Sequence, residues 1–329
     1  MAANNESSVV GPVAFKDAGE SVPLLEVKDV TVPTDPRNAN LGLHCYQGTC
    51  VLEQWVPGIM AIQQSFTPRR GDVILASAPK CGTTWLKALT FATMARGVHP
   101  PTDAEHPLLR LNPHDCVPFM EMLFAAGLRS KMDDMPSPRL MAAHMPHSLL
   151  PDSITRNPDC KIIYICRDPK DMVVSMWHYG RRIQPDASVS DVLELTCKGM
   201  SPSGPIWDHV LGYWNASKTS PEMVLFLRYE EMLCDPVENA RKIAQFVGQP
   251  FSKAQEETGM IMDTVRLCSF HKLKNLDVNK TGSQSPFAND GYFRKGEAGD
   301  WANHMTPEMA RRLDAIVEEK LRGSGFSFA

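Results

Sequence analysis

The chain has 329 residues, of which 43% are hydrophobic and 22% charged, enough to bury the core of one large α/β domain or two small ones. Its formal net charge of −4 excludes a global basic field of the kind that binds nucleic acid or an anionic membrane. The N-terminus lacks the basic and apolar segments of a signal peptide, and no run approaches the roughly 18 apolar residues of a membrane span.

The nine cysteines are an odd number and include no C-x-x-C pair. This pattern predicts neither a disulfide framework nor a zinc site. Because reduced thiols are typical of the cytosol, we expect a cytoplasmic protein without a metal centre and without a nucleic-acid or membrane partner.

Residues 1–40 are polar and irregular, which predicts a flexible N-terminal arm ahead of one domain over residues 41–329. Within this domain, three apolar runs typical of buried parallel strands cover 72–78, 161–166 and 222–227. Helical patterns cover 83–97, 169–180, 236–248 and 306–321. The alternation predicts an α/β fold, a single P-loop-like three-layer domain with a central parallel sheet flanked by helices.

The segment "ASAPKCGTTW" (76–85) follows the first apolar run. A strand that ends at a glycine turn and continues into a helix offers unpaired N–H groups to an anion, and Lys80 adds a full charge. Lys80 precedes Gly82, however, and no G-K-S/T occurs in the chain, so the segment is not a Walker A loop. The alternative is a capped helix with an incidental lysine.

Two further segments have the composition of phosphate sites. In "YICRDPKDMVVSMWHY" (164–179), Arg167 ends a predicted strand and Ser175 lies about two helical turns later. In "GYFRKGEAGDW" (291–301), Arg294, Lys295 and Gly296 form a basic loop. The alternatives are an ion pair of Arg167 with a neighbouring aspartate and a merely solvated loop.

With these residues the sequence resembles the cytosolic sulfotransferases, and among them the plant soluble branch. The strings "PKCGTTW", "RDPKDMVVS" and "RKGEAGDW" are similar to the family's three cofactor motifs. "LRYEEM" (227–232) and "LCSFHKLK" (267–274) fall between them in the family's order. The resemblance extends from about residue 55 to the C-terminus.

The resemblance implies the sulfuryl donor 3′-phosphoadenosine 5′-phosphosulfate (PAPS) and a small hydroxylated acceptor. It places Lys80 at the oxygen that bridges phosphate and sulfuryl group. The residues implied at the cofactor, besides Lys80, are Cys81, Gly82, Thr83 and Thr84 at the 5′-phosphate; Arg167, Ser175, Arg294, Lys295 and Gly296 at the 3′-phosphate; Trp85, Tyr229, Cys268, Ser269 and Phe270 around the adenine; and Phe293 in the 291–301 segment.

The resemblance also identifies the catalytic base as His144, in "RLMAAHMPHSLLP" (139–151). A neutral imidazole there takes the acceptor's hydroxyl proton while the oxygen attacks sulfur in line. The chain departs from the family at Ala142, where many animal members carry a lysine, and at Ala143, where threonine is frequent. Cysteine at 81 and 268 replaces hydroxyl residues that are common there.

The acceptor pocket is expected near residues 116–127, His178–Tyr179 and 181–205, where several of the 18 methionines suggest an apolar, adaptable surface. Candidate acceptors are a flavonoid, a brassinosteroid, a strigolactone precursor, a hydroxyjasmonate or a desulfoglucosinolate. The animal dimerisation string is largely absent after Trp301, so we expect a monomer. The alternatives are an inactive nucleotide-binding protein of the same fold and, more remotely, a P-loop kinase.

Overall fold

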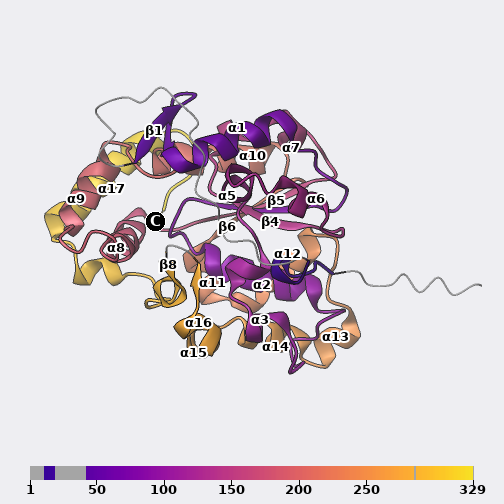
Figure 1. Cartoon of the computed structure of the whole chain (residues 1–329). Helices are drawn as coiled ribbons and strands as arrows, with labels where there is room; N and C mark the ends of the chain where they lie inside the picture. Colours follow the sequence, from indigo (N-terminus) through magenta and orange to yellow (C-terminus); the bar gives the residue numbers. More distant parts are fainter. Residues whose placement is uncertain (1–10, 19–41, 285–286, 329) are drawn as a thin grey trace, which may run out of the picture.

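Four parallel strands form the central sheet in the spatial order β4-β3-β5-β6 (Figure 1). They are β3 (Val73–Ser77), β4 (Leu140–Ala143), β5 (Lys161–Cys166) and β6 (Val224–Arg228). The computed structural model describes residues 11–18, 42–284 and 287–328. Two short antiparallel pairs lie outside the sheet: β1 (Leu43–Tyr46) with β2 (Thr49–Leu52), and β7 (Ser283–Gln284) with β8 (Phe287–Ala288).

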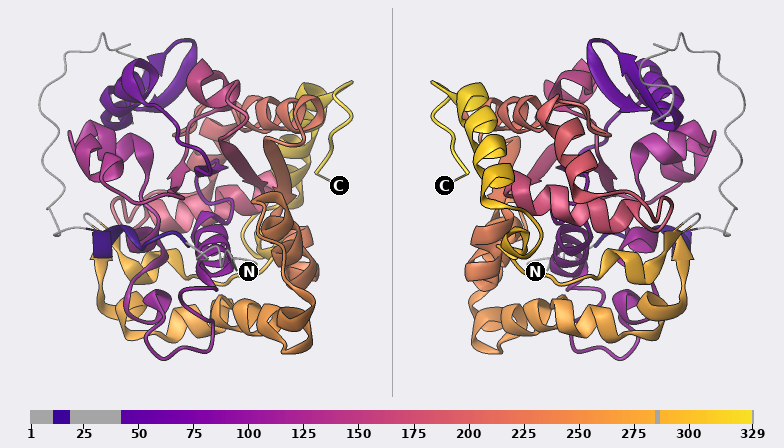
Figure 2. Two further views of the ribbon diagram at one scale, coloured as in Figure 1. Left: turned by 90° about the vertical axis from the view of Figure 1, so that its right-hand side faces the viewer. Right: turned by 90° about the vertical axis from the view of Figure 1, so that its left-hand side faces the viewer.

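Helices cover both faces of the sheet, as the views in Figures 1 and 2 show. One face packs against α1 (Val56–Ser65), α5 (Met120–Ala125), α8 (Pro169–Gly180), α10 (Ile206–Thr219) and α17 (Pro307–Leu321). The other face packs against α2 (Thr83–Ala95), α12 (Pro236–Phe246) and α14 (Met260–Leu267). Further helices connect these: α3 (Pro107–Arg110), α4 (Pro113–Cys116), α6 (Arg129–Asp133), α7 (Asp152–Thr155), α9 (Val189–Cys197), α11 (Tyr229–Cys234), α13 (Lys253–Glu257), α15 (Phe270–Asn275) and α16 (Asp277–Thr281).

The strands are apolar throughout because both of their faces are buried. In β3, Ile74 and Ala76 belong to the core on one side of the sheet, whereas Val73 and Leu75 belong to the core on the other side. Successive side chains of a strand point to opposite faces, so this period of two divides the core into two layers. The predicted α/β fold with a central parallel sheet is confirmed.

The sequence prediction missed β4. Its four residues include two alanines and no β-branched side chain, so the local strand propensity is weak. β4 forms because it pairs with β3 in parallel register, with Leu75 opposite Ala142 and Ala76 opposite Ala143. Tertiary pairing therefore gives strand structure to a segment inside the long connection between α2 and β5.

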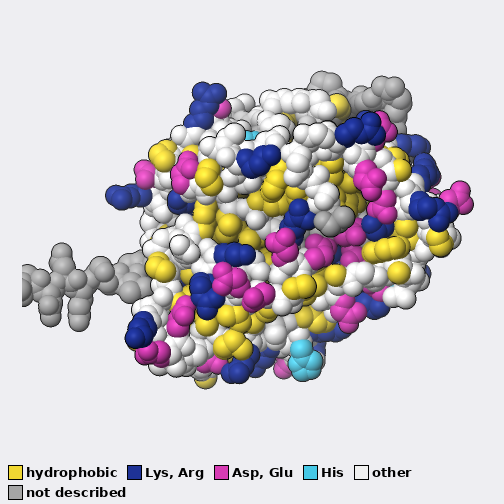
Figure 3. Space-filling model, turned by 180° about the vertical axis from the view of Figure 1, so that it is seen from behind, with side chains coloured by type: hydrophobic (Ala, Val, Ile, Leu, Met, Phe, Trp, Pro, Cys, Tyr) yellow, Lys and Arg dark blue, Asp and Glu magenta, His cyan; other side chains and the backbone are white. Residues whose placement is uncertain are grey.

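The described part of the N-terminal segment, residues 11–18, packs on the domain. Lys16 forms an ion pair with Asp115 at 2.7 Å, and Arg110 donates to Asp17 at 2.8 Å. Most of the predicted flexible arm lies outside the described residues. Within the described ranges, no helix is long and apolar enough to cross a membrane. On the face in Figure 3, basic and acidic side chains are interspersed rather than gathered by sign.

Candidate active site

The segments that follow β3, β4 and β5 surround a cavity of about 1740 Å³. This end of a parallel sheet is the usual ligand site of α/β folds. The predicted site residues that line the cavity are Lys80, Gly82, Thr83, Thr84, Trp85, His144, Arg167, Ser175, Tyr229, Cys268, Ser269, Phe270, Phe293, Arg294, Lys295 and Gly296. Cys81 is the exception, because its side chain is fully buried and its N–H donates to Ala78 O at 3.4 Å.

The loop between β3 and α2 presents the N-terminus of α2 to the cavity. The first N–H of the helical ladder is that of Leu86, which donates to Gly82 O at 3.0 Å, so the amides ahead of it face outward from the helix end. Gly82 has φ of 101°, and a Cβ there would lie 2.6 Å from Cδ2 of Tyr229. The turn therefore requires glycine for both its backbone conformation and its packing.

Lys80 carries its charge within a ring of aromatic and basic groups. Its Nζ lies 3.9 Å from the ring centroid of Tyr179 and 5.9 Å from that of Tyr292. Burial, together with the charges of Arg167 and two further arginines, lowers the pKa of Lys80 to about 7. A cavity that destabilises its own cations in this way is suited to an anion.

Arg167, directly after β5, is independent evidence that the cavity is suited to an anion. Its guanidinium donates to Glu297 O at 2.7 Å and lies 3.6 Å from Asp171, the ion pair considered as an alternative for this residue. Its buried Nε nevertheless has no hydrogen-bond partner in the described parts of the chain. Buried donors are rarely left unpaired, so this atom indicates a ligand acceptor such as a phosphate oxygen.

The third basic segment is held by two aspartates. Arg294 and Lys295 both contact Asp300, Lys295 at 2.5 Å. Asp171, in α8, accepts hydrogen bonds from the N–H groups of Gly299 at 2.6 Å and Trp301 at 2.9 Å. The loop after β5 and the basic loop thus form one structure, and neither is a separate solvated element.

Aromatic side chains enclose the cavity between the two basic regions. Trp85 and Tyr229 pack edge to face with centroids 5.8 Å apart. Phe270 packs against Gly296, where a Cβ would lie 2.4 Å from its ring. Cys268 is fully buried, and the Ser269 hydroxyl accepts from the N–H of Lys272 to cap α15. The flat apolar faces of this part of the cavity suit a purine base.

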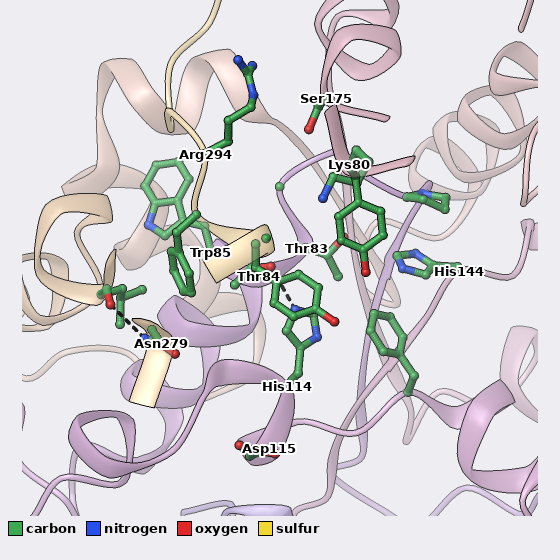
Figure 4. A pocket seen from close by; sticks show the side chains of 18 of the residues that line it. Lys80, Thr83, Thr84, Trp85, His114, Asp115, His144, Ser175, Asn279 and Arg294 are labelled. Carbon is green, nitrogen blue, oxygen red and sulfur yellow. Dashed lines mark hydrogen bonds between the residues drawn. The ribbon is translucent and has the colours of Figure 1, made fainter. Parts of the chain in front are cut away.

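His144 follows β4 and reaches the cavity from the opposite side (Figure 4). Its Nδ1 lies 2.7 Å from the carbonyl oxygen of Ser77. A carbonyl oxygen only accepts, so Nδ1 carries the proton and Nε2 is left with a lone pair. Burial is the main cause that lowers the pKa of His144 to about 3, which keeps the ring neutral. Trp55 stacks on the ring at 5.5 Å, and Phe119 lies at 4.5 Å.

Sequence reasoning missed a buried polar pair beside this centre. His114, in α4, contacts the Thr84 hydroxyl through Nε2 at 3.0 Å, one of the dashed lines in Figure 4. Its Nδ1 lies 3.0 Å from Nζ of Lys87, a fully buried lysine of α2. A lysine three residues after Thr84 within an apolar helix is a signal that the sequence contains, because residues three apart share a helix face.

The acceptor end of the cavity is largely apolar. Residues of the region predicted for the acceptor line the cavity, among them Phe119, Met122, His178, Tyr179 and Pro202, and their role toward an acceptor stays a prediction. Trp55, ahead of α1, was not anticipated. At the rim, Arg182 donates to both carboxylate oxygens of Asp290, at 2.8 and 3.0 Å, so the two charges compensate each other.

Comparisons with known proteins agree with this geometry. The family model of the sulfotransferase domain matches residues 70–325. Cytosolic sulfotransferase 5 of Arabidopsis thaliana is 43% identical over 307 residues, which cover 91% of this chain and 94% of the relative. The chain belongs to the cytosolic sulfotransferase family.

Solved structures of sulfotransferases share the fold. A putative steroid sulphotransferase of Arabidopsis thaliana superposes with a TM-score of 0.71 at 32% identity, covering 92% of this chain and 100% of the other. The mouse sulfotransferase SULT7A1, in complex with 3′-phosphoadenosine 5′-phosphate (PAP), superposes with a TM-score of 0.67 at 28% identity, covering 86% of this chain and 95% of the other. The predicted enzyme class and the donor PAPS are thereby confirmed: this is a PAPS-dependent sulfotransferase.

Proposed function

We propose that this sulfotransferase transfers the sulfuryl group of PAPS to a hydroxyl of a small, mostly apolar metabolite, with His144 as the base. The observation that carries the proposal is the hydrogen bond from His144 Nδ1 to Ser77 O at 2.7 Å. It leaves the lone pair of Nε2 to accept the acceptor's hydroxyl proton as its oxygen attacks in line. Because the ring packs against Trp55 and Phe119, it is held in this orientation.

The three basic segments would hold the donor at its two phosphate groups. The amides and hydroxyls of Gly82–Thr84 would bind the 5′-phosphate at the N-terminus of α2. Arg167, with its unpaired buried Nε, would bind the 3′-phosphate together with Ser175 and the 294–296 loop. When bound, PAPS supplies an activated sulfuryl group with a phosphate as the leaving group.

Lys80 is the residue suited to the charge that develops on the leaving oxygen. Its ammonium is preorganised by Tyr179 and Tyr292, and its backbone holds a left-handed φ of 69°, which is rare for a residue with a side chain. A cation fixed in advance near the departing group stabilises the transition state without reorganisation. A bound polyanion also offsets the neighbouring arginines and restores the charge of Lys80.

The acceptor subsite favours an uncharged, apolar molecule. Its wall combines Trp55, Phe119, Met122, Leu128 and Met176, and Arg182 at the rim is paired with Asp290. Flat or polycyclic hydroxylated metabolites, such as flavonoids and steroids, match this surface. The Arabidopsis structure described as a putative steroid sulphotransferase is consistent with this class.

Three predictions from the sequence remain proposals. We propose that residues 41–329 form the catalytic domain, that the N-terminal arm over 1–40 docks on it through residues 11–18, and that the protein is a monomer. A cytoplasmic location agrees with the relatives, which are named cytosolic sulfotransferases. An inactive nucleotide-binding protein is disfavoured because both His144 and Lys80 line the cavity.

Thermal unfolding with nucleotides tests the proposed site. We expect PAP at 100 times its dissociation constant to add about 2.7 kcal/mol of stability. Adenosine 5′-phosphate lacks the 3′-phosphate, and ATP with magnesium lacks it too, so both should stabilise the protein much less at the same concentration. Equal stabilisation by the three nucleotides would contradict the assignment of Arg167 and the 294–296 loop.

A further inference from the structure

Three polar side chains form a continuous chain behind the N-terminus of α2. Lys87 Nζ contacts Nδ1 of His114 at 3.0 Å, and Nε2 of the same ring contacts Oγ1 of Thr84 at 3.0 Å. In Figure 4 Thr84 is drawn directly above His114, and both residues line the cavity. The direction of the hydrogen bonds along this chain decides what the Thr84 hydroxyl can offer to a ligand.

Lys87 fixes the direction at the buried end. Its Nζ donates to Val117 O at 2.8 Å and lies 3.4 Å from the ring centroid of Phe119. Burial lowers the pKa of this lysine well below its usual range, and the carboxylates of Glu121 and Asp115 offset this only in part. The geometry favours the ammonium, because the Val117 carbonyl oxygen and the Phe119 ring face that Nζ meets are both acceptors. An ammonium has three donors and no acceptor, so Nδ1 of His114 must accept.

His114 transmits this direction to Thr84. Burial, followed by the charges of Lys87 and the nearby site residues, holds the pKa of His114 well below its usual range, so the ring carries one proton. With Nδ1 accepting, that proton is on Nε2, which donates to Thr84 Oγ1. The hydroxyl oxygen is thereby occupied as an acceptor, and its own O–H is directed elsewhere.

The ring of His114 is held in place independently of the ligand. The Asn112 side chain accepts a hydrogen bond from the main-chain N–H of His114 at 2.9 Å and donates one to the Asn279 side chain at 2.8 Å. These bonds tie α4 to α16. Tyr292 packs on the ring with centroids 4.3 Å apart. The orientation of the chain of hydrogen bonds is therefore a preorganised property of the fold.

We propose that Lys87 and His114 are positioning residues that make the Thr84 hydroxyl a committed hydrogen-bond donor to the 5′-phosphate of the bound nucleotide. The inference rests on the proposed function, which places this phosphate at the N-terminus of α2. Without the hydrogen bond from His114, the Thr84 hydroxyl could donate its proton to an acceptor within the protein. With it, the ligand phosphate receives a hydrogen bond that is polarised by a buried cation.

Calorimetric titration of two ligands tests the proposal. PAP carries the 5′-phosphate, whereas adenosine 3′-phosphate lacks it and keeps the rest of the nucleotide. In Lys87→Met the affinity for PAP should fall about 10- to 30-fold, the usual effect of a hydrogen bond to a charged group. The affinity for adenosine 3′-phosphate should change less than about twofold, because that ligand does not reach Thr84. Equal losses for both ligands would show that Lys87 acts only through the general structure, and would overturn the proposal.

Double substitution separates the relay from local packing. Thr84→Val should weaken the binding of PAP as much as Lys87→Met does. The double variant should bind PAP no more weakly than either single variant, because both changes remove the same interaction. Thr84→Ser keeps the hydroxyl and should retain the affinity for PAP. Thr90→Val removes another buried hydroxyl of α2 and serves as the matched control, with no expected change. Additive losses in the double variant would overturn the proposal, and His114→Phe repeats the test if Lys87→Met does not fold.

The unchanged protein distinguishes failure of this inference from failure of the proposed function. If it binds PAP no better than adenosine 3′-phosphate, the 5′-phosphate is not held at α2, and the proposed function and the relay both fail. If it prefers PAP and Lys87→Met keeps the full preference, the proposed function stands and the relay alone is wrong.

Discussion

The main-chain N–H of His144 donates to Oε1 of Glu121 at 2.5 Å, and the second oxygen of this buried carboxyl group has no hydrogen-bond partner among the described residues. Glu121 lies in α5, whose Met122 and Leu123 line the cavity, so this helix also fixes the backbone of the proposed base. Burial raises the pKa of Glu121 to about 7, although the hydrogen bond from His144 acts in the opposite direction.

This carboxyl group should make stability depend on pH. Because its pKa is higher in the folded chain, it lowers the free energy of unfolding as the pH rises from about 4.5 to about 7, by roughly 3 kcal/mol in total. Glu121→Gln removes this titration, so the free energy of unfolding of the variant should rise relative to that of the unchanged protein as the pH increases from about 4.5 to about 7. Urea unfolding at several pH values measures the difference. Glu318→Gln, on the exposed side of α17, is the control; a flat difference for Glu121→Gln would contradict the assignment.

Lys80 should take up a proton when an anion binds. Its pKa of about 7 leaves most of the population neutral at pH 8, and a bound polyanion raises the pKa again. Titration with PAP in buffers of different ionisation enthalpy should therefore show uptake of nearly one proton at pH 8. In Lys80→Arg the charge is permanent, and the uptake should vanish. Undiminished uptake in this variant would place the titrating group elsewhere.

Gly82→Ala should lower the free energy of unfolding by more than the strain of a positive φ alone would. Gly248, with φ of 75° and open space around a Cβ, isolates the conformational term, for which we expect about 1 kcal/mol in Gly248→Ala. At Gly82 the new methyl group also meets Tyr229 at 2.6 Å, which should add about 1–3 kcal/mol and weaken PAP binding. Chemical denaturation compares the two variants. Equal costs would show that Tyr229 moves aside freely.

The layered α/β architecture and the three phosphate-type segments could be predicted from the sequence alone. The 161–166 run and the 169–180 helix occur with the predicted bounds, because apolar runs buried on both faces and a proline at the first helical turn are strong local signals. Most of the residues inferred from three short motifs lie around one cavity. The first two motifs follow strands of the sheet and open helices, so parallel pairing brings them to the same edge. The 291–301 loop follows no strand of this sheet and is joined to them through Asp171.

What the sequence could not supply depends on contacts between distant segments. Whether Lys87 is a solvated charge or a buried donor depends on α4, whose His114 lies 27 positions later. The tautomer of His144 depends on Ser77, 67 positions earlier. The buried side chain of Cys81 likewise follows from how β3 and α2 enclose the loop. No local pattern in the chain identifies the distant partner in any of these relationships.

The measurement that tests the central claim most directly is sulfuryl transfer by His144→Ala, with PAP affinity recorded on the same preparation. The acceptor is any phenol or steroid that the unchanged protein sulfates. Since a positioned general base contributes about 10²- to 10⁴-fold, transfer should fall by that factor while the dissociation constant of PAP changes less than about threefold. A variant that binds PAP and still transfers the sulfuryl group at the unchanged rate would contradict the assignment of His144 as the base.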